Sequence, residues 1–359
     1  MIGIITPGNL KYTPYIQNYI DILKTNGIKY KVMSWNKAGI REDGVDFSFN
    51  YKVSDSNRKK MLFGYLGFIR KCKKYIKKHK IDKLIILTAA PAFFLKASYL
   101  SRFKGGYILD IRDDSPLIRK FPDYFKRLCS KAKSVVVSSN EFSPWTGRKT
   151  ILCHNVDLPQ LRIHKDDDPE ASVEYPIRIV FAGVMIEGPC NVEVLKAFQK
   201  DVRFEHIFIG RDSSGKKLIQ DFVKKSEIKN VTFEGAYNKE EIIDIYRKKA
   251  DLINIFRAKT TVNRNALPNK LYEAVLSGKP IVVFKHNIAI AKYAEKYNLG
   301  IVIPNSLQDD LNEYIFNKIH LFNYSKYKKG RDGFLKEVEN DMNTFFKMVL
   351  EFSFSVKNR

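Results

Sequence analysis

The residues best suited to chemistry lie in one run, residues 265–280, which is followed by a short apolar segment. The run reads as a loop, a short helix, a tight stop and a buried strand. Pro268 and Asn269 are typical of a helix start, Gly278 suits a left-handed C-terminal cap, and Pro280 prevents continuation. Such a helix carries unpaired N–H groups and about half a positive charge at its N-terminus. The run therefore predicts an anion-binding helix start.

Glu273 lies about one turn into this predicted helix. Its carboxylate can accept hydrogen bonds from the hydroxyl groups of a ligand whose phosphates occupy the helix N-terminus. Phosphates together with neighbouring hydroxyls describe a nucleotide. The alternative is an ordinary helix–strand unit with an exposed glutamate, and the residue pattern alone leaves both interpretations open.

The elements around this run alternate between apolar strands and helices, which predicts parallel, doubly wound sheets. The predicted strands are Ile2–Thr6, Tyr30–Trp35, Leu84–Leu87, Tyr107–Ile111, Ser134–Ser138, Ile177–Ala182, His206–Ile209, Asn230–Phe233, Asp251–Phe256 and Pro280–Phe284. The predicted helices include residues 15–25, Arg58–Lys80, Ala92–Phe103 and Phe334–Phe352. Ligands of such sheets bind just beyond the carboxyl ends of the strands.

Residues 158–176 interrupt the alternation with a charged run between prolines. We therefore predict an α/β protein with two doubly wound Rossmann-like domains facing a cleft. The first domain is residues 1–157, residues 158–176 form a linker, and the second domain is residues 177–333. A C-terminal helix in residues 334–359 is expected to pack back on the first domain.

The composition suits a well-packed two-domain protein, with 359 residues of which 44% are hydrophobic. Four cysteines are scattered without a CxxC pair or a partnered histidine spacing, which predicts a reducing compartment and no zinc site. The N-terminus lacks a basic leader, and the longest apolar run, residues 84–100, is too short to span a bilayer. We expect a soluble or peripheral protein.

The net charge of +24 requires an explanation. Residues 1–170 carry 32 Lys and Arg against 16 Asp and Glu, so the excess lies mostly in the first half. The predicted helix 58–80 is strongly basic, with interleaved Leu62, Phe63, Leu66, Phe68 and Ile69. It can be a solvated charged face, a surface for an anionic membrane, or a nucleic-acid surface. The apolar residues favour the membrane, and no nucleic-acid module is recognised, so no nucleic acid is expected.

Several motifs, in consistent order along nearly the whole chain, resemble the family-four retaining glycosyltransferases of the GT-B fold, particularly the bacterial surface-polysaccharide type. The motifs are Asn265–Val283, Phe181-Ala182-Gly183, Phe208-Ile209-Gly210, Phe233-Glu234-Gly235, Ala250-Asp251-Leu252, Ile108–Asp113 and His154-Asn155-Val156-Asp157. The resemblance implies transfer of a sugar, with retention, from a nucleotide-sugar donor to a glycan precursor.

The resemblance also assigns residues. Glu273 matches the second glutamate of the family's Glu-x7-Glu motif, which holds the ribose hydroxyls, but Asn265 stands where the first glutamate is expected. The family's basic pair is missing from the loop Val184–Gly188, which contains one acid. The donor diphosphate must then be neutralised by other cations. The candidates for this are Lys270, Arg264, Arg257 and Arg211.

In the first domain, Arg112 corresponds roughly to the family's acceptor-domain histidine, and Asp113 can orient the acceptor hydroxyl or simply cap the next segment. The implied donor-binding residues are Gly183, Gly210, Arg211, Arg264, Asn269, Lys270, Leu271 and Glu273, and the catalytic candidates are Arg112, Asp113 and Asn265. Asp113 and Asp114 are adjacent and point apart, so we expect no metal, and no cofactor besides the nucleotide sugar, which is a substrate.

We expect a lipid-linked or glycan acceptor and a cytoplasmic protein, peripheral on the inner face of the membrane. Besides a nucleic-acid-binding α/β protein, which predicts a steeply salt-dependent affinity for duplex DNA or RNA, two alternatives remain open. The substitution at Asn265 and the missing basic pair suit a catalytically weak homologue that binds nucleotide sugar within a glycan-assembly complex. A GT-B epimerase acting on the nucleotide sugar is the other, although the cleft carboxylates and histidines of that class are sparse here.

Overall fold

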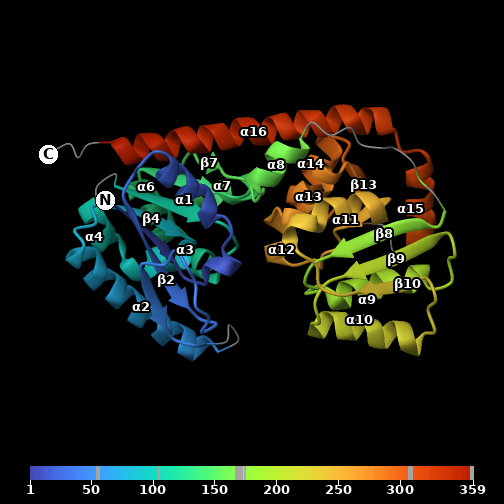
Figure 1. Cartoon of the computed structure of the whole chain (residues 1–359), viewed down its shortest axis with the longest axis horizontal. Helices are drawn as coiled ribbons and strands as arrows, with labels where there is room; N and C mark the ends of the chain where they lie inside the picture. Colours follow the sequence, from blue (N-terminus) through green and yellow to red (C-terminus); the bar gives the residue numbers. More distant parts are fainter. Residues whose placement is uncertain (54–56, 104–105, 166–172, 174, 306–309, 356–359) are drawn as a thin grey trace. The chain divides into compact units, whose positions relative to one another are not determined.

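The computed structural model describes residues 1–53, 57–103, 106–165, 173, 175–305 and 310–355. Its contacts divide the chain into two units. The first unit comprises Met1–His154 and Asn340–Arg359, and the second comprises Asn155–Glu339 (Figure 1). Each unit contains one parallel sheet with helices on both faces. The predicted fold class of two doubly wound α/β domains is confirmed.

Within the described residues, the first unit contains a seven-stranded parallel sheet of order β3-β2-β1-β4-β5-β6-β7. Its strands are β1 (Ile2–Thr6), β2 (Tyr30–Asn36), β3 (Phe47–Asn50), β4 (Lys83–Leu87), β5 (Tyr107–Ile111), β6 (Ser134–Val137) and β7 (Ile151–Leu152). The α-helices are α1 (Ile16–Thr25), α2 (Arg58–Lys78), α3 (Ala89–Leu95), α4 (Ala97–Leu100), α5 (Pro116–Lys120), α6 (Pro122–Lys131) and α7 (Ser143–Thr146). The short 3-10 helices are η1 (Leu10–Tyr12), η2 (Ser101–Phe103) and η3 (Asn140–Phe142). The strands β1 and β5 are buried throughout, which explains their mostly apolar sequences, and Asp110 of β5 is a buried charged exception.

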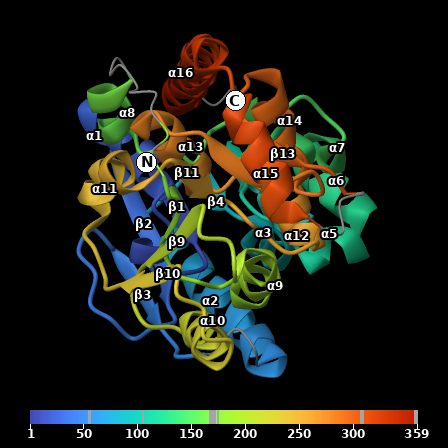
Figure 2. The same ribbon diagram turned by 90° about the vertical axis from the view of Figure 1, so that its right-hand side faces the viewer.

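Within the described residues, the second unit contains a six-stranded parallel sheet of order β10-β9-β8-β11-β12-β13. Its strands are β8 (Ile177–Ala182), β9 (Phe204–Ile209), β10 (Val231–Glu234), β11 (Leu252–Asn254), β12 (Ile281–Phe284) and β13 (Gly300–Ile303). The helices are α8 (Leu158–His164), α9 (Gly188–Phe198), α10 (Ser214–Lys225), η4 (Lys239–Glu241), α11 (Ile242–Lys249), α12 (Thr261–Asn265), α13 (Asn269–Ser277), α14 (Ile288–Lys296), α15 (Leu311–His320) and, as far as Glu339, α16 (Tyr324–Phe354). Helices α9 and α10 lie on one face of the sheet, and α11 and α13 lie on the other (Figures 1 and 2).

The long helix α16 contributes to the core of each unit. In the first unit, the ring of Phe345 packs edge-on against Tyr19 of α1, with the ring centroids 4.9 Å apart. Lys83 donates hydrogen bonds to the carbonyl oxygens of Phe352 and Ser353 at the end of the helix. In the second unit, the buried Arg331 donates to the carbonyl oxygen of Val275 in α13 at 2.8 Å.

Several elements differ from the sequence predictions. The prediction of a single helix over Ala92–Phe103 is wrong, because Lys96 adopts φ +69° and separates α3 from α4. Strands β3, β7 and β13 were not predicted. The predicted linker 158–176 begins with α8, and residues 166–172 and 174 lie outside the described residues. The predicted domain limits stay a prediction. None of the helices in the described part of the chain combines the length and apolar character needed to cross a membrane.

Candidate functional site

Helix α13 forms as the run 265–280 predicts, from Asn269 to Ser277, and it stops at Gly278 in the left-handed conformation (φ +73°). The roles of the first two residues differ from the prediction. Pro268 occupies the N-cap position in an extended conformation, and Asn269 is the first helical residue. Proline offers no capping side chain, and the N–H of Leu271 donates to the carbonyl oxygen of Pro268 at 3.1 Å. The N–H groups of Asn269 and Lys270 precede this bond, at the end of the helix that favours an anion.

Lys270 places its ammonium group beside the carboxyl end of β8. Its Nζ lies 4.2 Å from the centroid of the Phe181 ring. A Cβ atom on Gly183 would lie 2.8 Å from the same Nζ, so Gly183 and Lys270 are close neighbours, and the φ of +132° at Gly183 favours glycine there. Burial lowers the pKa of Lys270 and the charge of Arg257 adds to this, while Glu273 opposes it. A bound anion would relieve the cost of this half-buried cation.

Glu273 lies one turn further along α13 and is half-buried. Burial raises the pKa of this carboxyl above its usual range, and the charges of Lys270 and Lys239 counteract the shift. The pKa of Tyr237 and of Tyr246 is raised, first by burial and then by the charge of Glu273, so both phenols lie in its electrostatic neighbourhood. The site therefore combines a carboxylate that accepts hydrogen bonds with a nearby cation.

Glycines bring the loops after β8 and β9 into direct backbone contact. A Cβ on Gly210 would lie 2.2 Å from the carbonyl oxygen of Gly183. A Cβ on Gly215, in the first turn of α10, would lie 1.7 Å from the carbonyl oxygen of Met185. Neither loop can hold its position if these glycines carry a side chain. The sequence identified Gly183 and Gly210, but not Gly215.

Glu187 lies in the loop after β8, where the glycosyltransferases that the sequence resembles have a basic pair. Its carboxylate accepts a hydrogen bond from the backbone N–H of Ala258 at 3.0 Å and another from Nδ2 of Asn263 at 2.8 Å. The loop is thereby joined to the segment 257–265 that leads into α13. Sequence reasoning noted the acid but missed this role. The available signal was an acidic residue where the family has a base.

The other predicted donor residues occupy different environments. Arg211 and Arg264 are exposed after β9 and within α12, and Asn269 is exposed at the start of α13. Asn265 is half-buried as the last residue of α12. Leu271 is fully buried, so its side chain belongs to the core of the second unit and not to a ligand surface.

The first unit gives Arg112 a set of internal partners. Its guanidinium forms a double contact with the carboxylate of Asp110 at 2.7 Å and donates to the carbonyl oxygen of Cys153 at 2.9 Å. Tyr19 donates a further hydrogen bond to Asp110. Arg112 is 3% exposed and Asp110 is 0% exposed. Asp113, in contrast, is exposed directly after β5. The catalytic roles of Arg112, Asp113 and Asn265 stay predictions.

The described residues contain no group of three or more His, Cys, Asp or Glu side chains placed to hold a metal ion. The expectation of a metal-independent reaction without a cofactor is not tested by this finding.

Solved structures of similar fold match the chain over nearly its whole length. Sucrose-phosphate synthase from Thermosynechococcus elongatus superposes with a TM-score of 0.68 at 13% identity, covering 98% of each chain. HepE from Anabaena, in complex with UDP and glucose, gives a TM-score of 0.64 at 14% identity, covering 99% of each chain. UDP-GlcNAc 2-epimerase from Neisseria meningitidis, bound to UDP-GlcNAc, gives 0.62 at 13% identity, covering 98% of this chain and all of the other. The chain has the GT-B fold.

The sequence comparison is more local. Residues 165–321 match the family model described as glycosyl transferases group 1. The matched region lies within the second unit and includes β8, Gly183, α13 and Glu273. Comparison with curated proteins gives no match. At these identities the structural neighbours establish the fold, and the family match is restricted to the unit that contains the candidate site.

Proposed function

We propose that this chain is a retaining, metal-independent glycosyltransferase, of the hexosyltransferase type, that uses a nucleotide-sugar donor. The observation that carries the proposal is the juxtaposition of Lys270 with Gly183, with Glu273 one turn along the same helix. An ammonium group and the open start of α13 suit a diphosphate, and a carboxylate suits the ribose hydroxyls. The match of this region to glycosyl transferases group 1 supports the same assignment.

The reaction breaks the bond between the sugar C1 and the diphosphate oxygen, which keeps the electron pair and leaves as part of the nucleoside diphosphate. The acceptor hydroxyl oxygen forms the new bond to C1, and its proton passes to an oxygen of the leaving diphosphate. Negative charge on the leaving diphosphate grows in the transition state, so fixed N–H groups and a cation placed against it lower the barrier. Lys270 and α13 would supply this stabilisation, and Glu273 would hold the ribose. Retention follows from the resemblance of residues 265–283 to the retaining family.

The acceptor is proposed to be a lipid-linked glycan precursor for a surface polysaccharide, such as a capsule or O-antigen. The protein would then act as a peripheral protein on the inner face of the cytoplasmic membrane. The basic helix α2, whose sequence interleaves cations with large apolar residues, motivates this location.

One alternative is favoured by specific observations. Asn265 carries no charge, and Glu187 is committed to the backbone of Ala258 and the amide of Asn263. A chain with these features can bind a nucleotide sugar without rapid transfer. Binding of donor with no turnover on any lipid acceptor would assign the protein as a binding partner in a glycan-assembly complex.

The test is the substitution Glu273→Gln, which keeps the size of the side chain and removes its charge. Donor affinity should fall 10-fold to 150-fold, because a hydrogen bond to a charged group contributes about 1.5–3 kcal/mol. Thermal stability should rise, because a folded-state pKa above the usual value means that ionised Glu273 destabilises the fold, and glutamine mimics the protonated form. Isothermal titration calorimetry with UDP-, GDP- and dTDP-sugars, together with thermal unfolding, measures both.

Glu193→Ala is the matched control, since it removes a carboxylate from an exposed ion pair with Lys196 on α9. It should leave donor affinity and stability unchanged. A Glu273→Gln protein that binds every donor as tightly as the wild type would refute the assignment of Glu273 to the ribose.

A further inference from the structure

Helix α2 presents a defined face outwards because its inner face is fixed by close packing. A Cβ on Gly64 would lie 2.2 Å from the ring of Trp35, and a Cβ on Gly67 would lie 3.1 Å from the ring of Phe49. Phe68 and Cys72 on the same side are fully buried. The helix cannot rotate about its axis without losing this contact with β2 and β3. Its opposite face is therefore held towards solvent.

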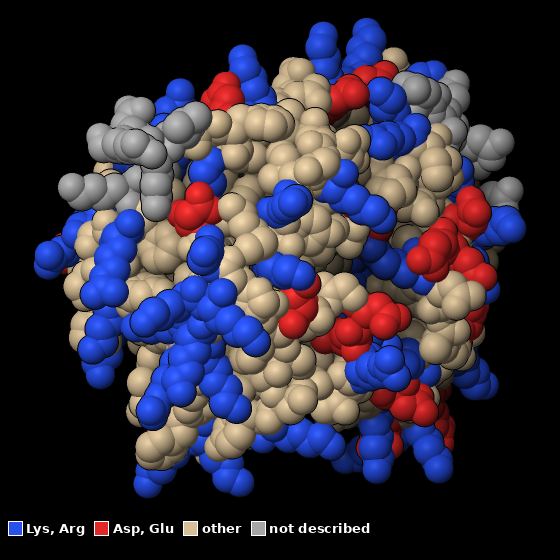
Figure 3. All heavy atoms as spheres, turned by 60° about the vertical axis from the view of Figure 1, so that its left-hand side comes forward, with Lys and Arg blue, Asp and Glu red and all other residues tan. Residues whose placement is uncertain are grey.

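The outward face changes character along the helix. In its first half Leu62, Phe63 and Leu66 are 49%, 67% and 51% exposed, an unusual exposure for three large apolar side chains within two turns. In the second half the outward residues are cations, beginning at Arg70 and continuing three, four and seven residues after it. These are Arg70, Lys73, Lys74 and Lys77. Lys and Arg side chains also gather over one part of the surface in Figure 3.

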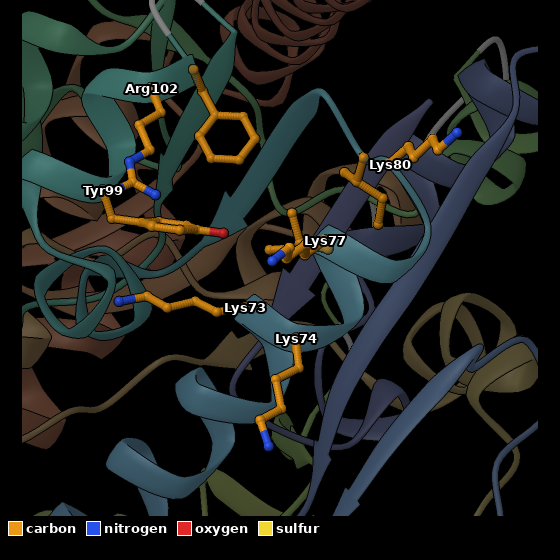
Figure 4. Close-up of a pocket in the computed structure, with 9 residues that line it drawn as sticks. Lys73, Lys74, Lys77, Lys80, Tyr99 and Arg102 are labelled. Atoms are coloured by element: carbon orange, nitrogen blue, oxygen red, sulfur yellow. The ribbon is translucent and has the colours of Figure 1, made fainter.

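The basic half of this face ends in a pocket of about 440 Å³. Its lining is composed of five cations, one tyrosine and an apolar group. The lining residues are Lys73, Lys74, Lys77, Lys80, Arg102, Tyr99, Ile76, Ile81 and Phe103. Figure 4 shows Lys73 and Arg102 on the two sides of the Tyr99 ring and Lys77 near its hydroxyl, while Lys74 and Lys80 point away at the rim. The Lys73 Nζ and the Arg102 guanidinium carbon lie 4.6 and 5.8 Å from the ring centroid.

The positive charges of the pocket have no negative charge beside them in the described part of its lining. Among the described residues that line it there is no carboxylate. The pKa of Lys73 is lowered, first by burial and then by the charges of Lys96 and Arg102. An anion in the pocket would offset this repulsion, because every charged residue of the lining is a cation. The tyrosine hydroxyl and the cations together match the oxygens of a phosphate group.

The position of the pocket separates it from the candidate donor site. Lys80 and Ile81 immediately precede β4, and Phe103 closes η2 just before β5. The pocket therefore lies at the amino ends of the strands of the first sheet, whereas substrates of doubly wound sheets bind beyond the carboxyl ends. It also belongs wholly to the first unit, and Lys270 and Glu273 belong to the second.

We propose that the outward face of α2 docks on an anionic phospholipid bilayer, with a headgroup phosphate in the pocket formed by Lys73, Lys77, Tyr99 and Arg102, and with Leu62, Phe63 and Leu66 inserted among the lipids. The proposal rests on the membrane location suggested above but not on glycosyl transfer itself. Apolar side chains beside a phosphate site distinguish a bilayer from nucleic acid, which offers phosphates without an adjoining hydrocarbon phase.

Two sets of substitutions separate the charged and apolar contributions. The charge variant, Lys73→Gln with Lys77→Gln and Arg102→Gln, should reduce partition onto phosphatidylcholine vesicles containing phosphatidylglycerol by roughly a hundredfold, at about fivefold per cation. The apolar variant, Leu62→Ser with Phe63→Ser and Leu66→Ser, should still bind these vesicles at low salt. It should dissociate from them at high salt, because salt screens the electrostatic attraction that remains. The matched control neutralises three exposed lysines of α10, with Lys217→Gln, Lys224→Gln and Lys225→Gln, and should bind like the wild type.

Vesicle co-sedimentation with and without phosphatidylglycerol measures these partitions, and circular dichroism confirms that each variant is folded. Equal binding of the wild type to vesicles with and without phosphatidylglycerol overturns the proposal. An equal loss in the α10 control does so as well, because it indicates attraction by net charge alone. Tighter binding of duplex RNA than of vesicles, unaffected by the apolar variant, reassigns the face to nucleic acid, and binding of inorganic phosphate without vesicle binding reassigns the pocket to a soluble anion. Donor calorimetry on the same variants reports separately on the proposed glycosyltransferase function.

Discussion

At the scale of single residues, Lys270 and Glu273 share an unusual feature. Each is half-buried on α13. Burial lowers the pKa of Lys270 and raises the pKa of Glu273, so it favours the neutral form of both side chains. Their mutual attraction compensates only in part. A nucleotide sugar would supply an anion to Lys270 and hydroxyl donors to Glu273. Two half-buried charges that a suitable ligand would stabilise are typical of a binding site.

Arg112 shows the opposite situation, since its charge is already matched inside the first unit. The substitution Arg112→Met should lower the free energy of unfolding by about 3–5 kcal/mol, because it leaves the fully buried Asp110 without its cation. Thermal or chemical unfolding of the purified variant measures this change.

The double variant Asp110→Asn with Arg112→Met serves as the control. It should recover much of the lost stability, because it removes the orphaned carboxylate as well as the guanidinium. If Arg112→Met instead unfolds like the wild type and loses only sugar transfer, the buried ion pair is not the main role of Arg112.

The sequence was sufficient for some site residues and insufficient for others, for a physical reason. Glu273, Lys270 and Gly183 could be chosen because a local run sets the helix start and the strand end. Arg112 has a near partner in Asp110, but it also donates to the carbonyl oxygen of Cys153, 41 positions away. The role of Glu187 depends on Ala258 and Asn263, 71 and 76 positions away. Partners so distant are set by the packed fold and leave no local pattern.

At the scale of elements, the loops after β8 and β9 hold their positions through direct backbone contact with each other. The substitution Gly215→Ala places a methyl group 1.7 Å from the carbonyl oxygen of Met185. Overpacking of this kind costs about 1–3 kcal/mol, which exceeds the gain of about 0.5–1 kcal/mol for alanine in a helix. Both thermal stability and donor affinity should fall, as measured by unfolding and calorimetry.

Gly235→Ala is the matched control, since a Cβ there meets no atom within 4 Å. Its stability should stay within about 0.5 kcal/mol of the wild type. Equal effects of the two substitutions would contradict the role assigned to the contact between the loops after β8 and β9.

Strands with mostly apolar sequences were predicted well. The bounds of β1, β5 and β8 agree with the structure, because strands covered on both faces carry an unmistakable pattern. Strand β3 alternates apolar and polar residues over only four positions, and β7 has two residues, so neither has enough sequence to be recognised. The break between α3 and α4 comes from the positive φ of Lys96, a residue type that gives no warning of it.

At the scale of the whole molecule, the net charge of +24 arises mostly in the first half of the chain and includes the outward face of α2. The second unit carries the region that matches glycosyl transferases group 1. We infer a division of tasks in which one unit binds the soluble nucleotide sugar and the other meets an anionic surface. Each task can then be altered by substitutions that leave the other intact.

Stability of the molecule should also depend on pH through His206, on β9. This histidine is buried, its ring packs against Phe198 with centroids 4.7 Å apart, and among the described residues neither ring nitrogen has a hydrogen-bond partner. Burial lowers its pKa to about 3, below the value of about 6.5 for an unfolded chain. The unfolded state therefore binds a proton that the folded state does not. The contribution of His206 to the free energy of unfolding is present above about pH 6.5 and is lost as the pH falls towards about 3.

Between pH 7 and pH 5 this single group should remove about 2 kcal/mol of folding free energy. The substitution His206→Leu keeps an apolar side chain of similar size in the core and removes the titrating ring, so its unfolding midpoint should decline less over this interval. Thermal unfolding of both proteins across the range measures the difference. Parallel pH profiles for the two proteins would mean that other buried groups, and not His206, set the acid sensitivity of the fold.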